Sequence, residues 1–371
     1  MTRVVVVGGG IAGVSAAAHL APRAEVTLLE MEETLAYHTT GRSAALFVVN
    51  YGAEGIRPLA RASESFLKSP PEGSTDAPLL SDRGLLWLAT PKQMARLESI
   101  AAEGHASGAR SRLLGPNEVA ALAPVVDSDR LAGGLYEPTA QDIDVAGLHQ
   151  AFVRIARSHG ARIETRAPAT AIARSGAGWQ VTTPAETHTA EVVVNAAGAW
   201  GDLVAEMAGV EAVGLQPKRR TAFMVPGDEA YAALPMVVDT DQLFYFKPDG
   251  VQLLCSLAEE SPSEPTDPRP RMEDVALAIE RINEATRLSI RTVNSQWVGL
   301  RTFAPDREMV IGEDPKAEGF FWLVGQGGTG IQTAPAYGSL LASLVLGHDL
   351  PAHLAKAGVD PSVTDPVRFS G

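Results

Sequence analysis

The chain has 371 residues, 45% of them hydrophobic and 20% charged, and it is long enough to bury two substantial cores. Its net charge of −13 argues against nucleic acid or an anionic membrane as the main partner, because both bind basic faces. The single cysteine, Cys255, excludes an internal disulfide and favours a reducing, cytoplasmic location. The sequence shows no secretory signal and no apolar run of the ~20 residues that span a membrane.

The first expected elements form a strand, a glycine turn, a helix and a second strand. Residues 4–7 are four valines, a run typical of a strand buried on both faces of a parallel sheet. Gly8, Gly10 and Gly13 follow with the spacing of a dinucleotide-binding turn, and the expected helix behind them offers free N–H groups to phosphate. Glu30 ends the next strand, where an acid accepts hydrogen bonds from an adenosine ribose. This order predicts a bound dinucleotide.

The rest of the chain alternates helices and strands without an internal repeat. Helices are expected at 56–67, 91–104, 116–122, 142–159, 272–285 and 331–346, and strands at 84–89, 161–165, 190–194, 221–225, 243–247, 252–257 and 320–324. Runs of small residues follow two of these strands, at 195–200 and 325–330. Because parallel strands end at one sheet edge, we expect the turns after Val7, Val194 and Val324 to meet at one cofactor crevice. The alternative for 195–200 is an ordinary strand-to-helix turn.

Together these motifs resemble the D-amino-acid-oxidase-like family of FAD-dependent amine and amino-acid oxidoreductases, over essentially the whole chain. Segments 37–45, 216–220, 244–249 and 297–301 are similar to bacterial FAD-dependent D-arginine dehydrogenases. The resemblance implies an α/β fold with two domains. These are a Rossmann-like FAD-binding domain (1–75, 143–212 and 304–371) and an α+β substrate-binding domain with a mixed or antiparallel sheet (76–142 and 213–303). It also implies oxidation of an α-amino acid to the imino acid by hydride transfer from Cα to flavin N5, followed by hydrolysis to the keto acid.

The resemblance assigns roles to individual residues. The implied catalytic set is Arg301 for the substrate carboxylate, Arg220 beside it, Tyr51 and Tyr245 along the substrate, and the Gly328 carbonyl for the amine. The implied FAD-binding set is Gly8, Gly10, Ile11, Ala12, Gly13, Glu30, Thr40, Gly41, Arg42, Ser43, Ala169, Ala197, Gly198, Trp200, Gly327, Gly330, Ile331 and Gln332. The alternatives without a catalytic role are a structural ion pair for Arg301, a solvated basic turn at 218–220, and core aromatics for the tyrosines.

The remaining histidines and the cysteine are not expected to have a catalytic or metal-binding role. Some relatives attach FAD covalently through a histidine where His38 stands, but the resemblance to D-arginine dehydrogenases favours non-covalent FAD. Cys255 lies in an apolar strand pattern and is expected to be a small buried hydrophobe. The eight histidines are scattered and mostly expected at the surface, and no metal site is expected.

The departures from D-arginine dehydrogenases concern the substrate pocket, expected at Leu46, Leu85, Gln242 and Thr329. In those enzymes an acid pairs with the distal cation of the substrate, whereas Leu85 stands here. Leu46 replaces a histidine, and Gln242 replaces an acid of the lid. An unpaired buried cation costs several kcal/mol, so the sequence predicts a D-amino acid with an apolar or uncharged side chain.

Three alternatives stay open at this point. The first is an amine, sarcosine-type or glycine-type oxidase that uses oxygen, and the second is a 2-hydroxy acid dehydrogenase with His38 as base. The third is a non-catalytic flavoprotein, against which the retained set of Arg301, Arg220, Tyr51 and Tyr245 speaks. The sequence leaves the electron acceptor open.

Overall fold

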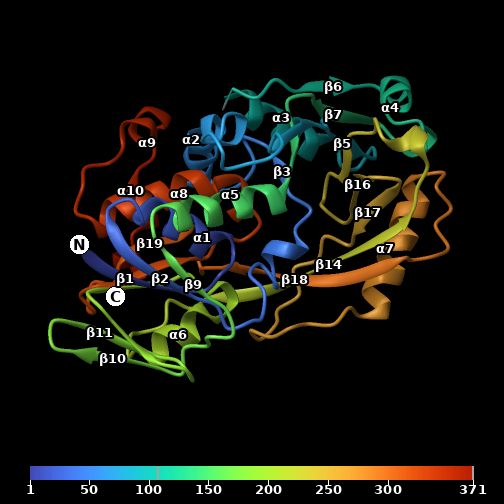
Figure 1. Ribbon diagram of the computed structural model, residues 1–371. Coiled ribbons are helices and arrows are strands. Elements are labelled where there is room, and N and C mark those ends of the chain that lie inside the picture. Colours follow the sequence, from blue (N-terminus) through green and yellow to red (C-terminus); the bar gives the residue numbers. More distant parts are fainter. Residues whose placement is uncertain (107, 370–371) are drawn as a thin grey trace.

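The N-terminal valines lie inside a six-stranded sheet in the computed structural model, which describes residues 1–106 and 108–369 (Figure 1). In sheet order the strands are β19 (Val310–Glu313), β20 (Phe320–Val324), β13 (Val192–Asn195), β1 (Thr2–Val7), β2 (Ala24–Leu29) and β9 (Arg162–Glu164). All neighbours are parallel except β19 and β20. The run of valines is buried because both faces of this sheet are covered.

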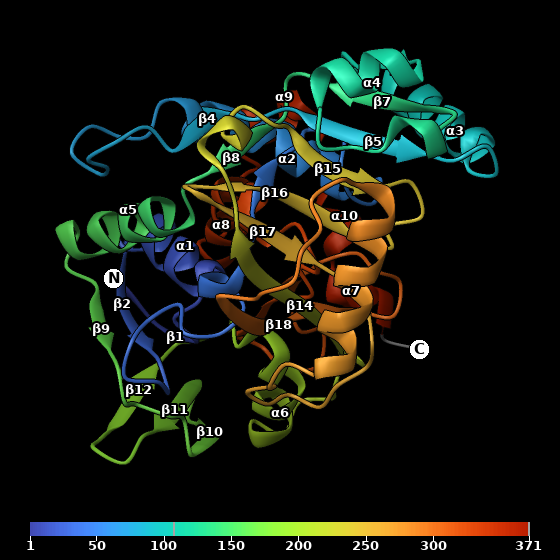
Figure 2. The same cartoon turned by 90° about the vertical axis from the view of Figure 1, so that its right-hand side faces the viewer.

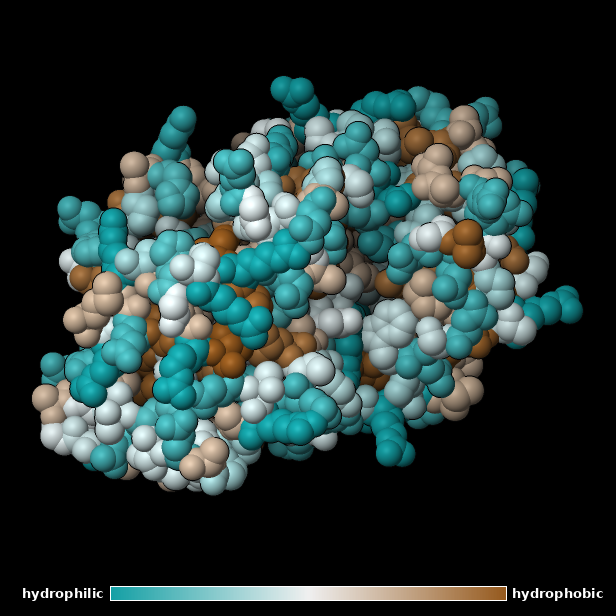
Figure 3. Space-filling view, viewed as in Figure 1, coloured by the Kyte–Doolittle hydropathy of each residue, from teal (hydrophilic) through white to brown (hydrophobic). Residues whose placement is uncertain are grey.

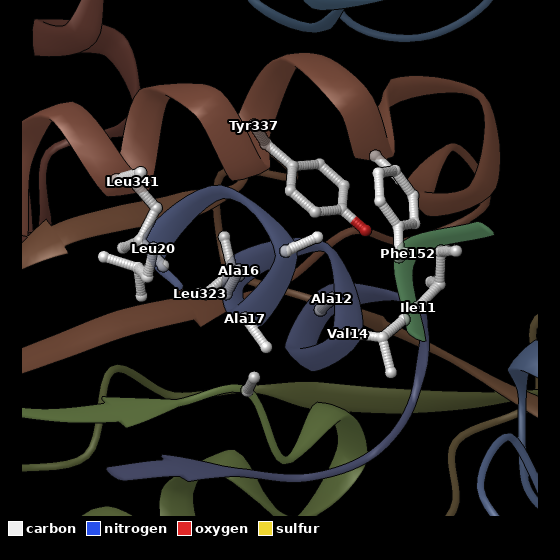
Figure 4. Packing of buried hydrophobic residues seen from close by; sticks show 14 of the residues in the cluster. Ile11, Ala12, Val14, Ala16, Ala17, Leu20, Phe152, Leu323, Tyr337 and Leu341 are labelled. Atoms are coloured by element: carbon white, nitrogen blue, oxygen red, sulfur yellow. The ribbon is translucent and has the colours of Figure 1, made fainter. Parts of the chain in front are cut away.

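Helices cover one face of this sheet. They are α1 (Ile11–Leu20), α2 (Ile56–Lys68), α5 (Val145–Ser158), α8 (Gly330–Val345), α9 (Ala352–Ala357) and α10 (Pro361–Thr364). Figure 4 shows the core that they share, where Leu20 of α1 lies near Leu341 of α8, and Tyr337 lies near Phe152 of α5. Val4 and Val6 belong to this core. The sheet therefore fixes α1 and α8 with their N-termini toward the edge where β1 and β20 end.

The other face packs on a small hairpin sheet and a short helix. The hairpin strands are β10 (Ala171–Ser175), β11 (Gly178–Thr182) and β12 (Thr187–Ala190), and the helix is α6 (Gly201–Met207). Val5 and Val7 enter this second core with Trp179 and Trp322. Alternate valines of β1 thus serve opposite faces, as the pleat of a strand requires.

The second large sheet has eight strands and stands beside the first (Figure 2). In sheet order they are β18 (Ser295–Phe303), β14 (Gln216–Pro226), β17 (Gln252–Ser256), β16 (Tyr245–Asp249), β15 (Met236–Asp239), β5 (Leu85–Ala89), β7 (Gly133–Glu137) and β6 (Arg112–Leu114). Only β15 and β5 run parallel, so the sheet is mixed. Helices α3 (Met94–Ala106), α4 (Pro116–Leu122) and α7 (Met272–Ala285) pack against it.

Smaller elements connect the two sheets. A three-stranded sheet joins β3 (Leu46–Phe47), β8 (Gln141–Ile143) and β4 (Leu80–Asp82). Single 3-10 turns lie at η1 (Thr40–Arg42), η2 (Ser128–Arg130), η3 (Gly198–Trp200), η4 (Glu229–Tyr231) and η5 (Pro366–Phe369). Residues in and next to β3, η1 and η3 reach the crevice between the two large sheets, so these connections position the site.

Most predicted elements are confirmed, and the departures have clear causes. The predicted strand 190–194 is two elements, because β12 ends at Ala190 and β13 begins at Val192. All five residues of β5 are buried, because Leu85, Trp87 and Ala89 enter one apolar cluster and Leu86 and Leu88 enter another. The strands that were not predicted are β3, β4, β6, β7, β8, β10, β11, β15, β18 and β19.

Hydrophilic side chains cover most of the face seen in Figure 3, and hydrophobic groups gather in one area over β1 and β2. In the ranges that the structure describes, every helix is too short or too polar to cross a membrane.

Candidate active site

The glycines of the first turn are required by backbone packing. Gly8 has φ +110°, and a Cβ atom there would lie 2.5 Å from the carbonyl oxygen of Ala196. A Cβ atom on Gly13 would lie 1.8 Å from the Gly8 carbonyl oxygen. Gly10 is the residue before α1, where a Cβ would meet only the Thr40 hydroxyl, at 3.2 Å. Gly13 thus allows helix and turn to pack, whereas Gly10 keeps the front of the turn open to a ligand.

Glu30 is held at the end of β2 by the same turn. The Gly9 N–H donates to one carboxylate oxygen of Glu30 at 2.7 Å, and the Glu32 N–H donates to the other at 2.9 Å. Behind the turn, the buried His149 donates from Nε2 to the Gly9 carbonyl at 3.0 Å. Burial lowers the pKa of His149, which keeps the ring neutral and fixes this donor. Glu30 is therefore preorganised to accept hydrogen bonds from a ribose.

Four loops converge on one cavity of about 440 Å³ in front of α1. They follow β1, β13 and β20, as expected, and the fourth contains η1. The predicted FAD residues that line this cavity are Gly8, Gly10, Ile11, Ala12, Glu30, Thr40, Arg42, Ser43, Ala169, Ala197, Gly198, Trp200, Gly327, Gly330, Ile331 and Gln332. Gly13 and Gly41 lie outside this lining. The Gly41 N–H instead donates to the Ala36 carbonyl, at 2.9 Å, within its own turn.

The predicted cofactor segment around η1 is tied to the second sheet. The Thr40 hydroxyl accepts the Ile11 N–H at 3.0 Å, at the start of α1. Arg42 donates to the Val298 carbonyl at 2.8 Å and pairs with Asp267 at 2.7 Å. Arg42 thus lines the cavity while its guanidinium holds β18 and the 267 loop in place.

Arg301 and Arg220 come together on neighbouring strands at the floor of this cavity. In the antiparallel pair β14–β18, Lys218 lies opposite Arg301 and Arg220 lies opposite Gly299, so these side chains share one face of the sheet. Arg219 points to the other face and donates to the Arg269 carbonyl at 2.7 Å. The expected alternative of a solvated basic turn at 218–220 is therefore wrong, because Arg219 and Arg220 are buried within a strand.

The electrostatics of this pair favour an anion. Burial and the like charge of Arg301 lower the pKa of Arg220. For Arg301, the neighbouring oxygens of Tyr51 and Tyr245 outweigh burial and hold its pKa above the ordinary value. Arg220 pairs with Glu260 at 3.6 Å, but Glu260 also pairs with Arg307 at 3.0 Å and with Lys218 at 3.7 Å. The Nε atom of Arg220 is also buried without a hydrogen-bond partner. Three cations therefore share the one carboxylate of Glu260, which leaves net positive charge among these ion pairs.

Tyr51, Tyr245 and Gly328 lie beside the Arg301 guanidinium. Tyr245 begins β16 and is buried, whereas Tyr51 lies in the loop after β3. A Cβ atom on Gly328 would lie 2.9 Å from Cζ of Arg301, so the glycine backbone rests directly on the guanidinium. All four residues line the first cavity.

A second cavity of about 570 Å³ shares Tyr51, Leu85 and Arg301 with the first and extends it toward β5, β7 and α3. Thr329 lines only this second cavity, Leu46 only the first, and Gln242 lines both. Gln242 is exposed, with φ +55°, at the turn between β15 and β16. The four predicted pocket residues therefore all reach the connected space.

Sequence reasoning missed two side chains in the second cavity, Trp87 and Glu137. Glu137 lies opposite Leu85 in the antiparallel pair β5–β7, and its side chain is buried. Burial raises the pKa of Glu137, which favours its neutral form. Only this long-range strand pairing brings an acid next to Leu85, so no local motif could have revealed it.

The remaining reactive side chains are accounted for as follows. His38 lines the first cavity, and its Nε2 lies 2.8 Å from Glu32 Oε1, while its ring lies 4.6 Å from that of Trp200. Cys255 is buried in β17, as expected, and burial raises the pKa of its thiol. Two histidines, His149 and His188, are buried and therefore do not fit the expectation of a mostly exposed set.

Comparison with known proteins identifies the family. The model of the FAD dependent oxidoreductase family, DAO, matches residues 3–344, and the chain belongs to this family. Mitochondrial sarcosine dehydrogenase of Homo sapiens is 27% identical over 364 residues, covering 92% of this chain and 39% of that protein. The chain thus spans well under half the length of this curated relative.

Solved structures agree on the fold. Glycine oxidase from Geobacillus kaustophilus superposes with a TM-score of 0.84 at 24% identity, covering 94% of this chain and 96% of that one. L-Proline dehydrogenase from P. horikoshii gives a TM-score of 0.85 at 22% identity, covering 100% and 98%. The chain is therefore an FAD-dependent oxidoreductase with the α/β fold predicted for it. None of these three relatives is a D-arginine dehydrogenase, so the predicted closeness to that group is not supported by them.

Proposed function

We propose that this protein oxidises a D-α-amino acid with an apolar or uncharged side chain to the imino acid, with FAD as the immediate electron acceptor. The observation that carries the proposal is the pair of the partly buried Arg301 and the buried Arg220 in a cavity continuous with the FAD crevice. An acidic protein with two guanidinium groups at one buried place has built a local site for an anion. A planar guanidinium pairs with both oxygens of a carboxylate, so an α-carboxylate suits Arg301.

The roles of the surrounding residues follow from their positions. FAD, when bound, supplies the group that accepts the hydride from the substrate Cα, and with it both electrons of the oxidation. Arg301 would hold the carboxylate, and the Gly328 carbonyl is placed to accept a hydrogen bond from the neutral amine. Tyr51 and Tyr245 would flank the bound carboxylate and exclude water from it. We assign to this chain the work of orienting the Cα–H bond, which needs no dedicated catalytic base.

The pocket beyond Arg301 supports the proposed side-chain class. Leu46, Leu85 and Trp87 offer apolar surface, and burying a side chain against them gains roughly 25 cal/mol per Å². Glu137, the acid opposite Leu85, has its pKa raised by burial and is therefore disposed to be neutral. The other acids that line the second cavity, Glu103, Glu260 and Asp306, already pair with arginines of this chain, so a distal cation would lack the free counter-charge that D-arginine dehydrogenases are expected to provide. The D configuration rests on the similarity of segments 37–45 and 297–301 to those enzymes.

Sarcosine-type and glycine-type substrates form the second candidate, because the relatives include sarcosine dehydrogenase and glycine oxidase. The same arginine clamp would bind their carboxylate. Such substrates have no side chain, however, and would leave the cavity of about 570 Å³ beside Leu85 and Trp87 unfilled. That space favours a larger amino acid.

We further propose non-covalent FAD and the two-domain division given above, with boundaries near 75, 142, 212 and 303. The proposed cofactor contacts are those of the lining glycines, Glu30 and the loops at η1, η3 and the start of α8. These loops come from every part of the proposed FAD-binding domain.

The deciding experiment is anaerobic reduction of the bound flavin, followed at its visible absorbance. The panel contains both enantiomers of methionine, leucine, phenylalanine and arginine, together with sarcosine, glycine and D-lactate. The proposal expects rapid bleaching by D-methionine, D-leucine or D-phenylalanine and slow bleaching by D-arginine. Faster bleaching by sarcosine, an L-amino acid or D-lactate overturns it. Hydrogen peroxide formed under air would then show whether oxygen is the second acceptor.

A further inference from the structure

A cluster of ligand-type side chains lies far along the edge of the first sheet from the arginine site. Glu164 ends β9, Glu186 ends the turn between β11 and β12, and His188 lies in β12. Figure 2 shows β9 running down to this hairpin. One carboxylate oxygen from each glutamate and one ring nitrogen of the histidine all lie within 4.8 Å of one another. Three separate pieces of backbone therefore bring their donor atoms to one point.

His188 is the informative member of this cluster. Its side chain is 92% buried, taken as the complement of its 8% exposure, and its Nε2 has no hydrogen-bond partner. That nitrogen lies 3.5 Å from Glu164 Oε2, so it points into the cluster. Burying an imidazole nitrogen without a hydrogen-bond partner costs free energy of folding. Such an atom therefore points to a partner that comes from outside the chain. The carboxylates beside it are the partners that a metal ion would share with it.

Arg162 occupies the outer side of the cluster. Its Nη2 lies 2.9 Å from Glu164 Oε1 and 3.3 Å from Glu186 Oε1. The Arg162 side chain is 62% exposed, so these ion pairs contribute little and the guanidinium can turn into water at small cost. Arg162 contacts the two glutamates, and the His188 nitrogen is left without a hydrogen-bond partner. A cation that accepts electron pairs from oxygen and nitrogen would satisfy all three ligands.

We propose that Glu164, Glu186 and His188 bind a divalent transition-metal ion of the zinc class, with Arg162 as the competing internal cation. Two carboxylate oxygens and one imidazole nitrogen leave a fourth position for water, as zinc coordination allows. The metal would clip the edge strand β9 to the β11–β12 hairpin. It would also steady the chain beside Glu30, whose N–H donates to the Glu164 carbonyl at 2.8 Å. This site takes no part in the proposed amino-acid oxidation.

The test is equilibrium dialysis of the tag-free holoenzyme against Zn²⁺ in the presence of excess Mg²⁺, with bound zinc measured by elemental analysis. The wild type is expected to hold one zinc per chain. The Glu186→Gln and His188→Ala variants should lose more than the ~10-fold in affinity that removal of an outer partner of a metal ligand typically costs. Glu186 is half exposed, so its variant is not expected to disturb folding. His159→Asn, an exposed histidine outside the cluster, serves as the matched control.

Arg162→Gln provides the sharper arm, because it removes the competing charge and should tighten zinc binding by about tenfold. FAD content and the unfolding temperature of each variant report whether the fold is intact. Zinc should raise the unfolding temperature of the wild type and not that of Glu186→Gln or His188→Ala. Zinc binding that is equal in the wild type, Glu186→Gln and His188→Ala, or weaker binding in Arg162→Gln, overturns the proposal.

Discussion

The backbone of Gly328 rests on the guanidinium of Arg301, with only 2.9 Å between Cζ and the position that a Cβ atom would take. This contact joins the loop that begins α8, part of the FAD crevice, to the strand β18 that carries the anion site. The position of one therefore sets the position of the other. Gly328, whose carbonyl is proposed to accept from the amine, and Arg301, proposed to bind the carboxylate, are therefore in direct contact.

The contact gives a first prediction. Gly328→Ala should push the Arg301 guanidinium aside and reduce kcat/KM for the best amino acid by roughly 100-fold, because small displacements at a reacting centre are costly. Gly299→Ala is the matched control, since its Cβ would meet its nearest neighbour at an ordinary 3.7 Å on the same strand. Flavin absorbance should be retained in both variants. Equal kinetics in the two would show that the contact does not position the arginine.

The second prediction concerns the choice of side chain. Leu85→Glu places a carboxylate in the wall of the second cavity and should raise kcat/KM for D-arginine about tenfold or more, by pairing a cation that is otherwise unpaired. Leu85→Gln has the same length without the charge and should not. Kinetics of both variants with D-arginine and D-methionine decide the matter. An unchanged ratio of the two substrates in Leu85→Glu would remove Leu85 from the specificity site.

The third prediction separates two glycines of the first turn. Gly13→Ala would place a Cβ 1.8 Å from a backbone oxygen, so it should lower the unfolding temperature even of the apoprotein. Gly10→Ala would meet only the Thr40 hydroxyl at 3.2 Å, so it should leave the apoprotein stable and weaken FAD binding. Thermal unfolding with and without added FAD measures both effects. A stable Gly13→Ala apoprotein would contradict the packing role of that residue.

The fourth prediction uses the raised pKa of Glu137. Its folded pKa lies above the unfolded value of ~4.3, so the wild type loses stability as the pH rises through the folded pKa. Glu137→Gln removes that loss and should raise the unfolding temperature at pH 8 more than at pH 5. Glu118→Gln should instead lower the unfolding temperature about equally at pH 5 and pH 8, because the Gly115 N–H and Arg112 hold the pKa of Glu118 below its ordinary value and its stabilising charge is lost only below the unfolded pKa of ~4.3. Equal shifts at both pH values would contradict the assignment for Glu137.

The sequence indicated the cofactor half of the molecule well, because its signals are local. Gly8, Gly10 and Gly13 with Glu30 specify a turn, a helix start and a strand end within one short segment. A local signal also sufficed for one helix of the substrate half, because α7 has the predicted bounds of 272–285. Here local propensity and tertiary packing ask for the same conformation.

The substrate half was harder to predict because the surroundings of each residue there depend on which strands pair. Lys218, Arg219 and Arg220 left a solvated turn open as the alternative to a substrate-binding role for Arg220, and the pairing of β14 with β18 buries Arg219 and Arg220. Leu85 suggested an apolar pocket, and Glu137 became its neighbour only through the pairing of β5 with β7. Glu164 and His188 likewise meet across separate strands. Residue spacing along the chain does not predict contacts of this kind, because they form between distant strands.

The fifth prediction concerns the attachment of FAD. His38 Nε2 is engaged by Glu32 at 2.8 Å, and non-covalent FAD should therefore leave the protein when it is precipitated with acid. The measurement is the flavin absorbance of the supernatant and of the pellet. A yellow pellet that loses its flavin in the His38→Asn variant would demonstrate a covalent link instead.

The central claim, that Arg301 holds the α-carboxylate of an amino acid, is tested most directly by removing that carboxylate from the substrate. The measurement is the rate of anaerobic flavin reduction by the best amino acid of the panel and by its decarboxylated amine, in the wild type and in Arg301→Lys. Arg291→Lys, an exposed arginine ahead of β18, is the control. The account predicts that the wild type prefers the amino acid by roughly 100-fold or more and that Arg301→Lys loses most of this preference. Equal rates with amine and amino acid in the wild type, or an undiminished preference in Arg301→Lys, would contradict it.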